Sequence, residues 1–167
     1  APCGTACTDG KRLIFDPEFS EQLKTEREMQ FVILHEVLHC VLEHCTRRGT
    51  RNSKLYNIAC DIVVNSTILG MWGIETFRVA NFEPMHLTPN GQEGREYHAE
   101  EVYQMLLKNS GNMLDGENLT LDRHDIWEGI QDDSVISDAW IQRIQTAAQA
   151  CQNTTEMPRN IRKVVDD

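Results

Sequence analysis

The amino-acid sequence predicts a single α+β domain over residues 1–167, predominantly helical and with a small sheet. Three observations support this fold class. The length of 167 residues suits one ordinary domain, and a hydrophobic fraction of 40% is enough for one packed core. Signals for the starts and ends of helices also outnumber the signals for strands. The chain begins at Ala1 rather than at a methionine, which is compatible with a fragment of a longer protein.

The N-terminal segment predicts one strand followed by a short helix. Residues 8–10, with the sequence Thr-Asp-Gly, form a turn signal, and residues 11–15 have the composition of a short strand. Asp16 is placed to cap the next helical turn. Pro17 suits the first helical position, because the N–H that proline lacks would have no partner there.

A long helix is expected from residue 26 to about residue 48. Thr25 and Glu28 form a capping box at its start. Arg47 and Arg48, followed by Gly49, are typical of a helix end. Apolar side chains recur three and four residues apart through the stretch: Met29, Val32, Ile33, Val37, Leu38, Val41 and Leu42.

A second long helix is expected from about residue 55 to residue 69. Asn52 or Ser53 would cap its start, and Gly70 would stop it. The elements expected after it are a loop over 71–94 with one strand near 76–79, a helix over 98–108, a polar acidic segment to residue 134, and a helix over 137–152.

Charge and hydropathy argue against two classes of partner. The chain has 16 Lys and Arg residues against 26 Asp and Glu residues, a net charge of −10. Sequence-independent nucleic-acid binding needs a basic surface, so we expect no nucleic-acid partner. The longest aliphatic and aromatic run covers only residues 31–34, whereas a membrane span needs about 20 apolar residues. We therefore expect no membrane partner either.

The cysteines predict reduced thiols and a cytoplasmic location. Most of the six cysteines lie in helical patterns, whereas small secreted proteins carry a denser set in loops. Cys3 and Cys7 form a pair, but no second pair follows at zinc-finger spacing. Cys40 and Cys60 are each rotated by about 100° or more from the candidate metal ligands named below. We expect both to be buried free thiols.

The motif that carries chemistry is His35-Glu36-Val37-Leu38-His39, an H-E-x-x-H match inside the first long helix. Residues four apart on a helix lie on one face, so both imidazoles can bind the same Zn²⁺. Glu36 would then act as the general base that takes a proton from a water. A bare match also arises by chance. Here it follows the apolar run 31–34, and buried polar side chains are costly without a purpose, which favours metal binding.

His44 is a tempting third ligand, because a further histidine after H-E-x-x-H occurs in the metzincins. In that pattern a glycine breaks the helix, and the histidine comes one residue later. Here Leu42 stands in place of the glycine. On a continuous helix His44 would lie about 180° from His35. We therefore expect His44 to be a structural or exposed residue.

Asp61 is the better third ligand. Asn57, Asp61 and Asn65 form a polar stripe, spaced by four, through an otherwise apolar helix. An acidic residue in such a helix is expected to face a cation. The sequence therefore predicts a zinc site formed by His35, His39 and Asp61. Its fourth position is left for water, as in catalytic zinc sites.

These residues resemble a known family. The run 34–44 with its H-E-x-x-H motif, followed by the run 56–65 with Asn-Ile-Ala-Cys-Asp, is similar to the prokaryotic family of putative metallopeptidase domains. That domain is usually joined to a C-terminal von Willebrand A-like domain. Weaker similarities follow the same order along the chain: residues 8–11, 99–103 and 122–127, then Trp140 and Pro158.

The resemblance implies a zincin-like fold in which a small mixed sheet packs on the active-site helix and an edge strand binds an extended peptide. It also implies a peptide or protein substrate and a von Willebrand A-like partner domain. His124 falls in a similar acidic-His-Trp stretch of the family. Its expected roles are stabilisation of the tetrahedral oxyanion or a structural bond to Asp122 or Asp125.

The sequence thus predicts a zinc-dependent metallopeptidase that hydrolyses peptide bonds. Water activated at Glu36 would be the nucleophile, and His124 would assist. The alternative is a non-catalytic metal-binding interaction module that acts with a partner domain. The glutamate between the histidines favours the enzyme, because a purely structural zinc takes a fourth protein ligand and needs no base.

Overall fold

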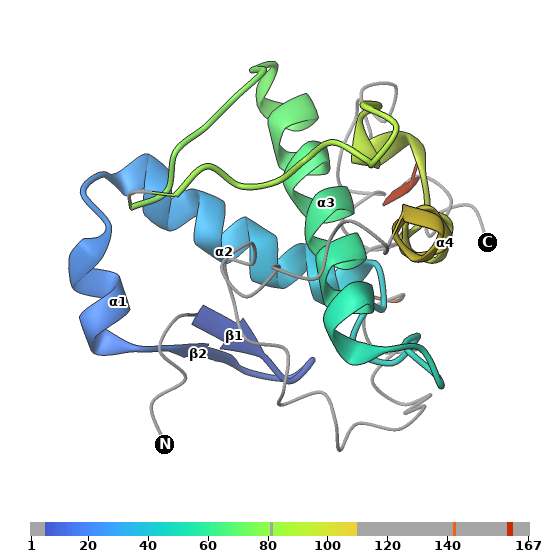
Figure 1. Ribbon diagram of the computed structural model, residues 1–167. Coiled ribbons are helices and arrows are strands. Elements are labelled where there is room, and N and C mark those ends of the chain that lie inside the picture. The colour runs from blue at the N-terminus through green and yellow to red at the C-terminus, as the bar shows by residue number, and fades with distance from the viewer. Residues whose placement is uncertain (1–5, 81, 110–141, 143–159, 162–167) are drawn as a thin grey trace.

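The computed structural model describes residues 6–80, 82–109, 142 and 160–161 (Figure 1). It confirms an α+β fold that is predominantly helical. The described elements, in chain order, are β1 (Ala6–Thr8), β2 (Leu13–Phe15), α1 (Pro17–Gln22), α2 (Glu26–Val41), α3 (Ser53–Trp72), the short 3₁₀ helix η1 (Gly94–Glu96) and α4 (Ala99–Asn109). The acidic segment to residue 134 and all but residue 142 of the helix expected at 137–152 lie outside this part.

The sheet consists of β1 and β2, which pair antiparallel with Ala6 opposite Phe15 and Thr8 opposite Leu13. The Asp9 side chain closes the turn by accepting the backbone N–H groups of Lys11 and Arg12 at 2.9 and 2.8 Å. The strand expected at 11–15 is therefore present. Its partner β1 was not expected, because all three of its residues are buried and no alternating pattern marks it. Within the described residues the sheet is antiparallel, whereas the resemblance implies a mixed one.

Both predicted caps at the start of the helical region are confirmed. Asp16 accepts the N–H of Glu18 at 3.0 Å, with Pro17 in the first turn of α1. Thr25 accepts the N–H of Glu28 at 3.1 Å, and Glu28 accepts the N–H of Thr25 at 2.9 Å, which completes the capping box of α2. Glu28 also accepts the N–H of Ala80 at 3.0 Å and so fastens a distant loop to the start of α2.

The prediction that this helix runs to residue 48 is wrong, because α2 ends at Val41. Glu43 has a φ of +57°, the left-handed conformation that usually requires glycine. The N–H of Glu43 bonds the carbonyl of Cys40 at 3.1 Å, and the N–H of His44 bonds the carbonyl of His39 at 2.9 Å. This pair of bonds is a Schellman motif. Arg47 donates to the carbonyl of Leu42 at 3.1 Å, so it caps the helix end from outside.

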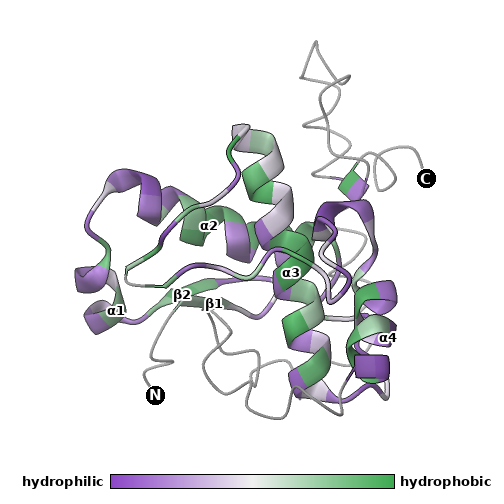
Figure 2. Cartoon of the chain, turned by 45° about the horizontal axis from the view of Figure 1, so that its top comes forward, coloured by the Kyte–Doolittle hydropathy of each residue, from purple (hydrophilic) through white to green (hydrophobic). Residues whose placement is uncertain are grey.

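α3 is the central helix of the fold. It packs against α2, η1 and α4, while β1 packs against α2 (Figure 1). The sheet and α4 thus lie on opposite sides of the α2–α3 pair. Figure 2 shows largely apolar colouring along α3 and strongly polar turns on α4. Every residue of α3 from Ala59 to Leu69 is buried, so its interior can hold a polar group away from solvent.

α3 is longer than the sequence predicts, because it continues through Gly70 and ends at Trp72. Gly73 provides the left-handed cap, with a φ of +66°. A Cβ at Gly70 would lie 2.8 Å from the Arg95 side chain, so the missing side chain lets that arginine cross the helix. Gly70 is therefore a packing position and not a helix stop.

The remaining described segments follow the sequence more closely. The helix expected at 98–108 is α4, Ala99–Asn109. The loop expected over 71–94 is present, but the strand near 76–79 is reduced to an isolated bridge between Val79 and Phe82. Among the described residues, none of the helices combines the length and the apolar character that a membrane span requires.

Candidate metal centre

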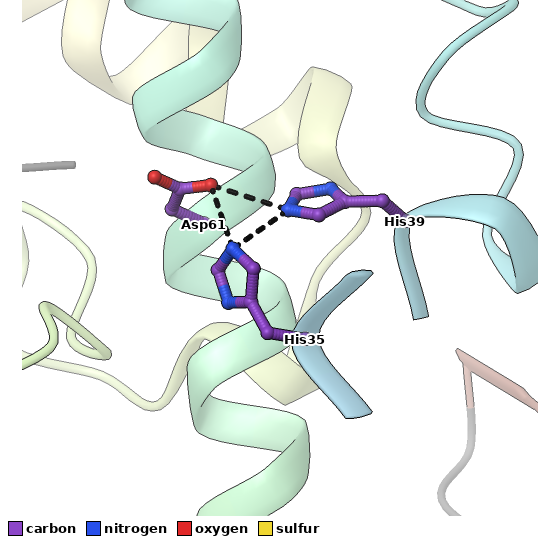
Figure 3. A group of neighbouring side chains, drawn as sticks. All are labelled: His35, His39 and Asp61. Atoms are coloured by element: carbon purple, nitrogen blue, oxygen red, sulfur yellow. Dashed lines mark hydrogen bonds and ion pairs between the residues drawn. The ribbon is translucent and has the colours of Figure 1, made fainter. Parts of the chain in front are cut away.

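Three ligand-type side chains converge between α2 and α3. His35 and His39 project from consecutive turns of α2, and Asp61 faces them from α3 (Figure 3). The Nε2 atoms of the two histidines are 3.0 Å apart. The Asp61 Oδ1 atom lies 3.6 Å from His35 Nε2 and 3.3 Å from His39 Nε2. The structure therefore brings together the three residues that the sequence predicts as metal ligands.

The spacing of the three ligand atoms fits a tetrahedral metal ion. Ligand bonds of about 2.0–2.1 Å place the ligand atoms of a tetrahedral zinc site roughly 3.3–3.4 Å apart. The separations of 3.0, 3.3 and 3.6 Å lie on both sides of this value. Two imidazoles with one carboxylate also suit zinc better than magnesium or calcium, which prefer oxygen ligands throughout. Geometry and donor chemistry thus agree.

Burial makes a cation at this position energetically reasonable. His35, His39 and Asp61 have relative exposures of 1%, 0% and 2%. An ionised carboxylate this deep in a protein is costly unless it is paired or coordinates a metal. A divalent ion bound by two neutral imidazoles and one carboxylate has a net charge of +1. A net charge of this size is small for a buried metal site.

His35 is oriented by Asn65, which lies one turn beyond Asp61 on α3. The His35 Nδ1 atom and the Asn65 Oδ1 atom are 2.9 Å apart. Because an amide oxygen only accepts, His35 carries its proton on Nδ1, which leaves the lone pair of Nε2 available for an ion held between the three ligand residues. Asn65 in turn donates to the carbonyl of Met85 at 3.0 Å, which fixes the orientation of its amide. This is the outer support that metal-ligating histidines commonly have.

His44 contacts the other histidine ligand. Its Nδ1 atom lies 3.0 Å from His39 Nδ1, and its relative exposure is 1%. The expectation of a structural or exposed residue is correct in its first half, since His44 is fully buried. Its placement about 180° away from His35 is wrong, because α2 ends at Val41 and the turn at Glu43 brings His44 back against the helix.

Glu36 lies between the two ligand histidines in the sequence of α2. Its side chain is buried, with a relative exposure of 1%. Its carboxylate lies near the thiol of Cys45. The pKa of Cys45 is raised well above its ordinary value, first by the hydrogen bond to Cys40, then by burial, and to a lesser degree by nearby negative groups that include Glu36. Its role as a general base stays a prediction.

The cysteines described by the structure do not join the centre. Cys40, Cys45 and Cys60 are buried free thiols, and Cys7 is buried in β1. Cys40 lies 3.3 Å from the Thr8 hydroxyl and is hydrogen-bonded to Cys45, which places it toward the sheet. The expectation of free thiols at Cys40 and Cys60 is confirmed.

Two other residues that the sequence singles out are not among the three ligand residues found in the described part of the chain. Asn57 is half-buried on α3, four residues before Asp61, and its buried Oδ1 atom has no hydrogen-bond partner among the described residues. His124, the candidate for oxyanion stabilisation, lies outside the described residues. Sequence reasoning gave no orienting role to His44, because its signal depends on where α2 ends.

The fold and the centre define a class: an α+β protein with an H-E-x-x-H helix packed on a second helix that supplies a carboxylate. The family comparison agrees with this class. Residues 1–163 match the model of the family described as "Putative metallopeptidase domain", so the chain belongs to that family. No curated protein and no solved structure matches the chain.

Proposed function

We propose that the protein is a zinc-dependent metallopeptidase with a zincin-like fold. The observation that carries the proposal is the convergence of His35, His39 and Asp61 at separations suited to one tetrahedral ion. Three protein ligands leave one position open for water or substrate, as in catalytic zinc sites. Bound zinc would supply a Lewis acid and would lower the pKa of a coordinated water to about 7.

The side chains of the protein have separate roles in the proposed reaction. His35, His39 and Asp61 hold the ion, and Asn65 fixes the ring of His35 through its Nδ1 proton. Glu36 accepts a proton from the attacking water and returns it to the leaving amine. His124 stabilises the negative charge that develops on the carbonyl oxygen. The substrate is a peptide or protein, and the domain acts together with a von Willebrand A-like partner domain.

The location that we propose is cytoplasmic. Cys40, Cys45 and Cys60 are free thiols, which supports a reducing compartment. The acidic composition supports the absence of a nucleic-acid partner.

A second candidate function follows from the depth of the site. The three ligand residues and Glu36 all have relative exposures of 2% or less. A peptide bond could reach residues this deeply buried only if neighbouring groups moved. A non-catalytic metal-binding module, in which the ion holds α2 and α3 together for a partner domain, needs no such movement. The two candidate functions differ in whether Glu36 acts as a general base.

The Glu36→Gln variant separates the two functions. Glutamine is nearly isosteric with glutamate but cannot accept the proton, so zinc should stay at one ion per chain while peptide hydrolysis is lost. Removal of a general base lowers a rate by about 10²- to 10⁴-fold. Metal content by mass spectrometry and cleavage of a mixed peptide library give the two readouts. A wild-type protein that holds zinc and cleaves nothing would support the non-catalytic module.

A further inference from the structure

We propose that His44 is a positioning residue that holds the ring and the proton of the metal ligand His39. The inference rests on the proposed metal centre but not on peptidase activity. The first observation is the backbone. The Schellman motif at the end of α2 bonds the N–H of His44 to the carbonyl of His39 at 2.9 Å. The two residues are therefore fixed to one another before their side chains interact.

The second observation is the side-chain contact. His39 Nδ1 and His44 Nδ1 lie 3.0 Å apart, and both residues are buried, with exposures of 0% and 1%. A neutral imidazole has one N–H donor and one acceptor nitrogen. His39 Nε2 faces His35 Nε2 and Asp61 Oδ1, so it must offer a lone pair there to bind an ion. The His39 proton then lies on Nδ1 and is donated to the acceptor Nδ1 of His44.

The third observation is a matching contact at the other histidine ligand. Asn65 Oδ1 accepts the Nδ1 proton of His35 at 2.9 Å. Each metal-binding imidazole thus has an acceptor on its outer nitrogen, one from α3 and one from the turn after α2. Such partners fix the tautomer of a metal ligand, and their loss typically costs about 10- to 100-fold in metal affinity.

The placement of His44 has its own conformational cost. Glu43 adopts the left-handed region with a φ of +57°, which is unfavourable for a residue with a Cβ. Arg47 supports this turn by donating to the carbonyl of Leu42 at 3.1 Å and pairing with Glu100 of α4 at 2.7 Å. The turn is therefore anchored to the same helix layer that surrounds the centre.

The test compares zinc dissociation constants of three His44 variants by competition with a chromophoric chelator. Asparagine places an acceptor oxygen where histidine has Nδ1, since both atoms are bonded to Cγ. Glutamine places it one bond further away, and leucine offers no acceptor. We expect His44→Asn to stay within about 3-fold of the wild type. His44→Gln and His44→Leu should bind zinc about 10- to 100-fold more weakly.

Two further measurements separate positioning from general stability. The visible spectrum of the cobalt-substituted protein should change in His44→Leu and be restored in His44→Asn, because it reports the geometry of the ligands. His98→Leu, at a half-buried histidine before α4, is the control and should leave zinc affinity unchanged. If His44→Leu does not fold, the comparison of the asparagine and glutamine variants still decides.

Equal zinc affinities in the three variants and the wild type would overturn the role of His44 and leave the metal centre intact. A wild-type protein without zinc affinity would instead refute the centre itself. Differences in affinity without any peptide cleavage would support His44 as a positioning residue and count against the peptidase alone.

Discussion

Asp61→Asn is the sharpest test of the ligand set, because it removes the charge of one ligand and keeps its shape. Asp61 Oδ1 lies within 3.6 Å of both histidine Nε2 atoms. Asp61 is only 2% exposed, so a group from the surface cannot easily take its place as a ligand. Three protein ligands share the ion. With an apparent zinc-binding free energy of about 10–16 kcal/mol for structural sites, losing one ligand should cost several kcal/mol, or at least about 100-fold in affinity.

This loss should appear directly in thermal stability. Zinc at a free concentration 1,000 times its dissociation constant stabilises the folded chain by about 4.1 kcal/mol. A 100-fold weaker site under the same conditions gives only about 1.4 kcal/mol, from the same linkage relation. At about 2–4 °C per kcal/mol for a chain of this size, zinc should raise the melting temperature by roughly 8–16 °C in the wild type and by roughly 3–6 °C in the variant.

The assay is calorimetry with and without zinc, combined with metal content after gel filtration. Asp16→Asn is the matched control. Asp16 is also a buried carboxylate, at 4% exposure, but it caps α1 by accepting the N–H of Glu18. Asparagine caps a helix about as well as aspartate, so this variant should keep both its stability and its zinc shift. An unchanged zinc shift in Asp61→Asn would show that Asp61 is not a ligand.

Two further predictions concern the capping box and the thiols. Burial raises the pKa of Glu28, but the N–H groups of Lys24, Thr25 and Ala80 and the Thr25 hydroxyl lower it more, so its folded value lies below 4.5. Its stabilisation is therefore complete above about pH 4.5 and is lost as the pH falls through the folded pKa. Acid unfolding followed by circular dichroism should show a shallower pH dependence in Glu28→Gln, and an identical slope would contradict this role. Cys40→Ser and Cys60→Ser should keep one zinc per chain, and the cobalt form should lack the intense near-ultraviolet band of thiolate ligation; a strong band would refute the ligand set.

The parts of the fold that the sequence predicts depend on interactions between residues a few positions apart. The caps at Asp16 and Thr25 involve neighbours two and three residues away, so the starts of α1 and α2 can be found from local patterns. The i, i+4 spacing of His35 and His39, and that of Asp61 and Asn65, belongs to single helices in the same way. The H-E-x-x-H pattern therefore indicated two of the candidate ligands before any tertiary contact was known.

Other features depend on contacts between distant segments, and only the tertiary structure decided them. α2 ends at Val41 because a left-handed Glu43 is held by Arg47, which itself pairs with Glu100 of α4, more than 50 residues away. α3 continues through Gly70, whose missing side chain leaves room for the Arg95 side chain, and ends before the left-handed Gly73. The position of His44 follows from the first of these effects. Its contact with His39 could not be predicted from helical spacing. That spacing assumes that the helix continues past residue 44, whereas α2 ends at Val41.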